Sequence, residues 1–172
     1  TETTTEPAPV VQEKTKEIEN STVESYRQPV GDLVPDTLIV SGVERSYLSY
    51  IPVSLPDNIP VIIQFHGGTG TSQNAYYQEG SLNLVADAEG ILMIYPQAET
   101  STGNVWNTLH SEEGNKVSAD DFGFIEAIID RLGEDSRIDT SRIYVAGYSN
   151  GAAMAYQIAC HLNDRIAGFV VH

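Results

Sequence analysis

Apolar positions divide the chain into a polar first stretch and a remainder in which short apolar runs alternate with amphipathic segments. Runs of β-branched and other apolar residues predict buried strands, because a strand covered on both faces needs apolar side chains at nearly every position. Ser41-Gly42 separates two strand-like runs and predicts a tight turn between them. The predicted strands cover residues 37–40, 45–53, 60–65, 91–95, 143–146 and 166–171.

Three segments have the pattern of helices. Residues 80–89 form the first, and apolar residues recur at helical spacing over 121–133. Asp120 or Asp121 is suited to cap that second helix, and a catalytic role for one of them is the alternative. Residues 151–162 are almost wholly apolar and predict a buried helix. Strands that alternate with helices predict an α/β fold with a mostly parallel sheet and helices on both faces.

The first residues differ in composition from the rest. Residues 1–29 are rich in Thr, Glu, Pro and Lys and have few apolar side chains, so we expect a disordered acidic linker. Residues 30–172 then form a single domain. Within it, the polar stretch over 97–117 is longer than most loops of compact domains, which indicates a functional loop.

Gly147-Tyr148-Ser149-Asn150-Gly151 follows a predicted strand and precedes a predicted helix. This Gly-x-Ser-x-Gly order is typical of a nucleophile elbow, a sharp turn that exposes a serine hydroxyl above the sheet. Glycines on both sides allow the strand and the helix to approach without Cβ clashes. We therefore predict that Ser149 is a catalytic nucleophile; the alternative is a glycine-rich turn with a solvated serine.

A serine that attacks an ester carbonyl needs N–H donors for the oxyanion that forms. The N–H of Asn150, directly after the serine, is the expected first donor. The glycines of segment 66–70 allow a close approach to substrate, so we expect the second donor at Gly68, with Thr69 as the next choice and a plain turn as the alternative. Trp106, in the long loop, either binds substrate as a pocket wall or packs against the core.

Several motifs follow one another in a specific order along residues 37–171. They are Glu44-Arg45-Ser46-Tyr47, Ile51-Pro52, Phe65-His66-Gly67-Gly68-Thr69-Gly70, Leu84, Ala86-Asp87-Ala88-Glu89-Gly90, Tyr95-Pro96-Gln97, Trp106-Asn107, Asp120-Asp121-Phe122-Gly123-Phe124, Ile138-Asp139, Arg142-Ile143-Tyr144 and the helix from Ser149 to Cys160. Together they resemble the polyhydroxybutyrate depolymerase and feruloyl esterase family. One departure is Ala152, where the family usually has a second glycine.

The resemblance implies an α/β-hydrolase fold and a secreted serine esterase that acts on a polyester or on feruloyl and acetyl esters of plant polysaccharide. In that fold the triad follows the order serine, acid, histidine. Because the chain ends soon after Ser149, we expect the acid and the histidine beyond residue 172 and the chain to be the N-terminal part of the domain, truncated after the strand that follows the nucleophile helix. His66 and His172 are the alternatives for the general base; a brace for the loop and a chain end are their other interpretations.

The composition narrows the partners. The net charge of −15 excludes nucleic acid and anionic membranes as partners, because both bind positive charge. No apolar run has the length of a membrane span, and no metal-ligand, phosphate-loop or dinucleotide spacing occurs, so no cofactor is expected. Cys160 is the only cysteine and is expected to be buried.

These features predict an extracellular serine carboxylesterase, monomeric when full length, with a polymeric or small ester as its substrate. Two alternatives remain. A serine peptidase on the same fold uses the same triad. A non-catalytic binding protein with this fold, or an inactive fragment, would retain the elbow without turnover.

Overall fold

The computed structural model describes residues 28–78, 80–108 and 118–172. The linker expected over residues 1–29 lies almost wholly outside the described residues and stays a prediction, and so does the second half of the long loop. The strands are β1 (Asp32–Val40), β2 (Val43–Ile51), β3 (Ile59–Phe65), β4 (Leu92–Pro96), β5 (Ile138–Gly147) and β6 (Gly168–Val171). The helices are α1 (Ser72–Gln78), α2 (Gly80–Glu89), α3 (Asp121–Gly133) and α4 (Asn150–His161), with a 3-10 turn at Thr100–Thr102.

All six strands form one sheet in the order β1-β2-β4-β3-β5-β6. β1 and β2 form an antiparallel hairpin, and β2 runs antiparallel to β4. The remaining neighbours, β4 to β6, are parallel. Ser41 and Gly42 both have positive φ, as a two-residue hairpin turn of this twist requires. The predicted hairpin and the mostly parallel sheet are therefore confirmed.

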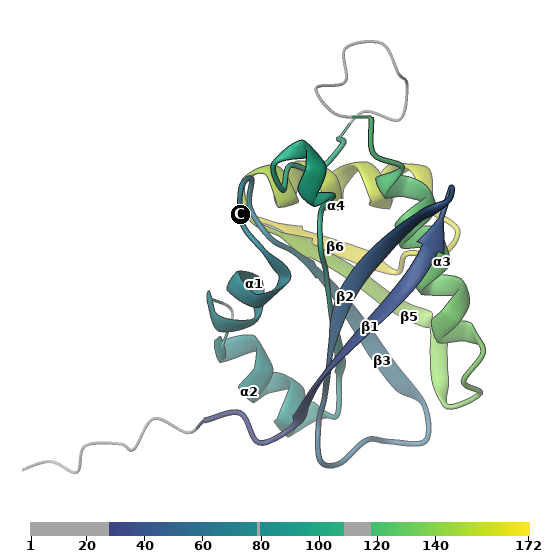
Figure 1. Cartoon of the computed structure of the whole chain (residues 1–172). Coiled ribbons are helices and arrows are strands. Elements are labelled where there is room, and N and C mark those ends of the chain that lie inside the picture. The colour runs from purple at the N-terminus through teal and green to yellow at the C-terminus, as the bar shows by residue number, and fades with distance from the viewer. Residues whose placement is uncertain (1–27, 79, 109–117) are drawn as a thin grey trace, which may run out of the picture.

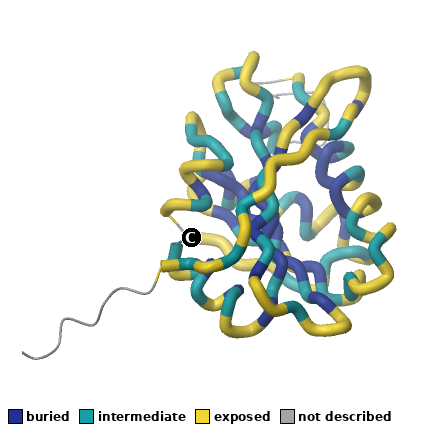
Figure 2. The backbone as a smooth tube through the Cα atoms, turned by 60° about the horizontal axis from the view of Figure 1, so that its bottom comes forward, coloured by how far each residue is buried: buried dark blue, intermediate teal, exposed yellow. Residues whose placement is uncertain are grey.

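Helices cover both faces of the sheet (Figure 1), as the sequence predicted. α1 and α2 pack over β2, β3 and β4, whereas α3 and α4 pack on the opposite face over β1, β3, β5 and β6. Alternate residues of β3 separate the two sides: Val61, Ile63 and Phe65 lie in the larger core with α3 and α4, and Ile62 packs against the smaller core with α1 and α2. Buried residues accordingly gather in the interior of the molecule (Figure 2).

One helix was not predicted, and one expectation was wrong. α1 lies in a segment for which no helix was predicted; its N-terminus is capped by the hydroxyl of Thr71, which accepts a hydrogen bond from the N–H of Asn74 at 3.1 Å. Cys160 is exposed, not buried. α4 buries only the side that faces the sheet, at Gly151, Met154, Ala155 and Ile158, and Cys160 lies off that side in spite of its apolar surroundings in sequence.

Candidate active site

Ser149 lies at the junction of β5 and α4, at the carboxyl edge of the sheet, and is exposed. Its φ of 54° and ψ of −117° are strained for a residue with a side chain, as expected for an elbow. A Cβ atom at Gly147 would overlap the carbonyl oxygen of Gly151, and one at Gly151 would overlap the carbonyl oxygens of Phe65 and His66. The two glycines therefore allow the close approach that the motif predicted.

The two residues expected to supply the oxyanion donors lie close together. A Cβ atom built on Gly68 would stand 3.4 Å from the Cβ of Asn150. Among the described residues, neither the N–H of Gly68 nor that of Asn150 has a hydrogen-bond acceptor. Thr69, the second choice, is excluded as a donor because its N–H already donates to the carbonyl oxygen of Asn104 at 3.0 Å.

His66 braces the glycine loop. Its side chain is buried, its Nδ1 donates to the carbonyl oxygen of Gly67 at 2.7 Å, and its Nε2 accepts from the N–H of Ala98 at 3.1 Å. These two partners fix the neutral ring with its proton on Nδ1. Burial lowers the pKa of His66, which also favours the neutral ring. Because both nitrogens are occupied, the loop-bracing interpretation holds and His66 is not available as a general base.

Trp106 does not line a pocket. Its side chain is 2% exposed and packs edge-on against Phe65, with 5.2 Å between the ring centres. The indole N–H donates to the carbonyl oxygen of His66 at 2.9 Å, and the backbone N–H donates to Oδ1 of Asn150 at 2.8 Å. The substrate-binding assignment is corrected on this ground, because a buried ring with both N–H groups engaged offers no surface to a substrate.

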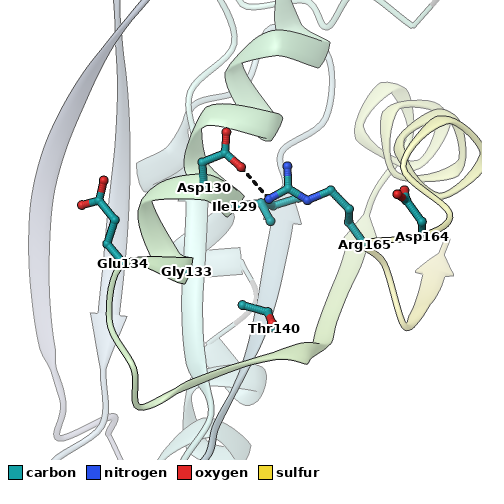
Figure 3. A pocket seen from close by; sticks show the side chains of 7 residues that line it. All are labelled: Ile129, Asp130, Gly133, Glu134, Thr140, Asp164 and Arg165. Carbon is teal, nitrogen blue, oxygen red and sulfur yellow. Dashed lines mark hydrogen bonds and ion pairs between the residues drawn. The ribbon is translucent and has the colours of Figure 1, made fainter.

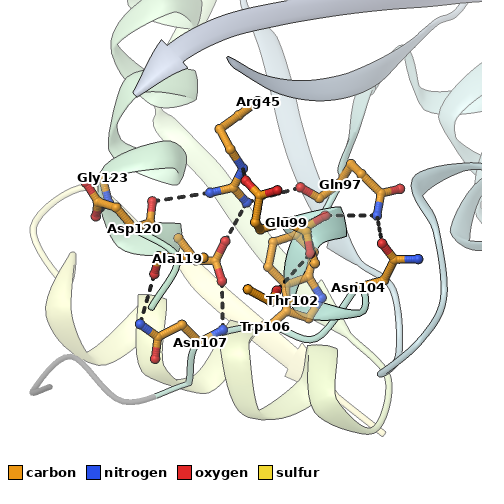
Figure 4. A network of polar contacts seen from close by, with 12 residues as sticks. Arg45, Gln97, Glu99, Thr102, Asn104, Trp106, Asn107, Ala119, Asp120 and Gly123 are labelled. Atoms are coloured by element: carbon orange, nitrogen blue, oxygen red, sulfur yellow. Dashed lines mark hydrogen bonds and ion pairs between the residues drawn. The ribbon is translucent and has the colours of Figure 1, made fainter. Parts of the chain in front are cut away.

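A buried ion pair that the sequence did not reveal anchors the long loop (Figure 4). Arg45 on β2 and Asp121 at the start of α3 are 4% and 0% exposed, and 2.5 Å separates their charged groups. The other carboxylate oxygen of Asp121 accepts from the N–H of Asn107 at 2.7 Å, and Arg45 donates to the carbonyl oxygen of Gln97 at 3.2 Å. Burial raises the pKa of Asp121, and the charge of Arg45 opposes that rise.

Neither candidate aspartate is free for catalysis. Asp121 is held in the ion pair, and the side chain of Asp120 accepts from the N–H of Gly123 at 3.0 Å. Asp120 is thus the cap of α3, as one of the two predicted interpretations had it. The only sequence feature that pointed to this ion pair was an arginine, Arg45, within a predicted strand. No feature near Asp121 identified it as the partner of Arg45.

The remaining histidines have contacts of other kinds. The carbonyl oxygen of His172 accepts from the N–H of Ser149 at 3.1 Å, and its ring lies 5.4 Å from that of Tyr148. His161 packs edge-on against Phe122. His110 lies outside the described residues. Across the described ranges, no group of three or more His, Cys, Asp and Glu side chains is arranged to hold a metal ion.

A depression of about 450 Å³ lies at the opposite edge of the sheet from Ser149 (Figure 3). Thr140, near the start of β5, lines it together with the end of α3 and the turn after α4. An ion pair of 2.6 Å between Asp130 and Arg165 crosses it. This depression is therefore separate from the elbow.

None of the helices in the described part of the chain has the length and apolar composition needed to span a bilayer.

A strained serine between a parallel strand and a helix, with a glycine loop beside it, defines an α/β-hydrolase fold. Solved structures agree: the acetyl xylan esterase from Aspergillus awamori superposes with a TM-score of 0.68 at 24% identity, over 82% of this chain and 51% of that chain. The chain belongs to the esterase PHB depolymerase family, whose sequence model matches residues 45–172. This confirms the resemblance seen in the motifs.

Two curated relatives illustrate the similarity. A bifunctional acetylxylan esterase/xylanase from Neocallimastix patriciarum is 29% identical over 74% of this chain and 18% of its own length. Acetylxylan esterase A from Emericella nidulans is 31% identical over 72% of this chain and 40% of its own length. The chain thus spans less than half the length of these relatives.

Proposed function

We propose that the protein is a serine esterase in which Ser149 attacks the carbonyl carbon of a carboxylic ester. The observation that carries the proposal is the close approach of Gly68 to Asn150 beside an exposed, strained serine, with backbone N–H groups that have no acceptor among the described residues. Donors held in this way stabilise the oxyanion of the tetrahedral intermediate without having to reorganise during the reaction.

Collapse of that intermediate releases the alcohol and leaves the acyl group on the Ser149 oxygen, and water then releases the acid. The hydroxyl proton must pass to a general base and from it to the leaving alcohol. The contacts described above support Ser149 as the nucleophile and Gly68 and Asn150 as the oxyanion donors, and they assign the role of the base to none of the histidines.

For the substrate, we propose acetyl or feruloyl esters of a plant polysaccharide, or a polyhydroxyalkanoate. The relatives named as acetylxylan esterases support the first class, and the family description supports the second. The exposed position of Ser149 fits a polymer that approaches a surface. We also propose an extracellular location, which is where an enzyme for plant polysaccharide meets its substrate and which cell fractionation tests.

The test compares Ser149→Ala with the unchanged protein on p-nitrophenyl acetate, acetylated xylan and polyhydroxybutyrate particles. Ser81→Ala, at an exposed position of α2, is the matched control. We expect Ser149→Ala to lose hydrolysis of every substrate that the unchanged protein cleaves, and a fluorophosphonate probe to label the unchanged protein and the control but not this variant. Turnover of Ser149→Ala close to that of the control would contradict the assignment of the nucleophile.

A further inference from the structure

The two oxyanion donors belong to segments far apart in the sequence. Gly68 lies in the loop after β3, and Asn150 begins α4. Two N–H groups stabilise one oxyanion only if their spacing is held constant. The glycine loop has high backbone freedom and Gly68 is exposed, so contacts from other segments contribute to fixing its position.

We propose that Trp106 is a positioning residue that holds the two oxyanion donors at a fixed spacing. This inference rests on the proposed esterase function. Trp106 binds both segments at once: its backbone N–H donates to Oδ1 of Asn150, and its indole N–H donates to the carbonyl oxygen of His66, two residues before Gly68. These contacts bridge 44 and 40 positions of sequence.

The indole is itself held on two sides. Its ring lies edge-on to Phe65 at 5.2 Å and tilted over His66 at 4.8 Å, measured between ring centres. Asn104, two positions earlier in the same segment, accepts from the N–H of Thr69. The segment around Trp106 therefore contacts the glycine loop on both sides of Gly68 and contacts the nucleophile helix at its first residue.

Asn150 has two parts in this arrangement. Its backbone N–H is the proposed oxyanion donor, and its Oδ1 accepts the hydrogen bond from the backbone N–H of Trp106. Loss of one oxyanion donor lowers turnover by about 100-fold or more. Displacement of a donor, without its loss, is expected to lower kcat by roughly tenfold and to leave KM nearly unchanged, because the interaction is made mainly in the transition state.

The experiment uses Trp106→Phe, which keeps an aromatic ring in the core and removes the indole N–H. Asn150→Ala, which removes the acceptor of the backbone bond, is the second variant. Ile128→Val removes buried packing on α3, outside both segments, so it serves as the control for lost stability. For each variant, kcat and KM for p-nitrophenyl acetate, the melting temperature, and hydrogen exchange of the amides in segment 66–72 are measured.

We expect both variants to lower kcat by roughly tenfold with little change in KM, and to accelerate exchange at the Thr69 and Gly70 amides, which are hydrogen-bonded in the unchanged protein. Ile128→Val should lower the melting temperature without either effect. Unchanged exchange in segment 66–72 in both variants would overturn the proposal. Unchanged kcat in a protein whose Ser149→Ala variant is inactive would overturn it as well. If Ser149→Ala has the same activity as the unchanged protein, the proposed function fails, and the exchange measurement still decides whether Trp106 holds the loop.

Discussion

Removal of both members of the buried pair Arg45 and Asp121 is expected to destabilise the protein by much less than the sum of the two single removals. In Asp121→Asn the guanidinium stays buried with two backbone carbonyl oxygens and with Glu99, which lies 3.9 Å away. In Arg45→Met the carboxylate stays buried with only the N–H of Asn107 among the described residues. An uncompensated buried charge of this kind costs about 3–5 kcal/mol.

For a chain of this size, such a cost lowers the melting temperature by roughly 6–20 °C. The double variant Arg45→Met/Asp121→Asn buries neither charge, so its cost should fall well below the sum of the two single costs. We expect a coupling energy of about 2 kcal/mol or more from the cycle, measured by urea unfolding of the four proteins. Costs that simply add would show that the two groups are not coupled and would refute the interpretation of the pair as an anchor.

The sign of the pH dependence gives a second check on the same variants. Burial raises the pKa of Asp121 in the folded protein, and loss of Arg45 removes the charge that opposes this rise. A carboxyl group with a raised folded-state pKa contributes stability at low pH that is lost as the pH rises through that pKa. The loss of unfolding free energy in Arg45→Met should therefore be smaller at about pH 5 than at about pH 8, because the pKa of the buried carboxyl lies above the ordinary aspartate value of about 4. A cost independent of pH would contradict this.

Three further predictions address single positions. Because burial lowers the pKa of His66, its contribution to stability is present above about pH 6.5 and lost as the pH falls; the melting temperature should drop more steeply with acid than in His66→Gln, and equal slopes in the two proteins would refute this. Gln64 is 1% exposed and its Oε1 has no hydrogen-bond partner within the described residues, so Gln64→Met should raise the unfolding free energy by about 1 kcal/mol, whereas Gln73→Met at an exposed position of α1 should leave it unchanged. β6 has an outer edge without a strand partner in the described sheet, and Val170 on this strand is 65% exposed. We expect the chain to self-associate through this edge, and Val170→Lys to reduce the associated fraction in size-exclusion chromatography. A monomeric unchanged protein would contradict the expected self-association.

The elements predicted from the sequence are those whose signals are local. Residues 80–89 and 121–133 were predicted as helices and are α2 and α3, because the signals for these helices are local in the sequence. Every predicted strand run overlaps an observed strand, but two strands begin five residues earlier than predicted. β1 begins at Asp32 because it pairs along the whole of β2, and β5 begins at Ile138. α1 was missed because its few residues bury only Ala75, so no apolar periodicity marks it.

The candidate site divides in the same way. The elbow was predictable because its requirements, a strained serine and two glycines that admit close backbone contacts, are met within five consecutive residues. The rest of the site depends on contacts between distant segments. The sequence could not show that the carbonyl oxygen of Asn104 accepts from the N–H of Thr69. Nor could it decide between a pocket and the core for Trp106, which is buried in the structure.

The length of the long loop predicted a functional segment, but it did not predict what the residues of the loop do. Loops of this length are usually functional, and the described part of this one does lie at the candidate site. Its residues serve the site by holding other segments: Asn104 and Trp106 fix the glycine loop and the nucleophile helix, while Asn107 ties the same segment to the buried Asp121. The ion pair of Arg45 and Asp121 is thus linked, through this loop, to the segments that carry the two proposed oxyanion donors. Consequently, we expect Arg45→Met to lose activity and to show faster hydrogen exchange in segment 66–72. The two effects together would connect the stability of the loop with the chemistry at Ser149.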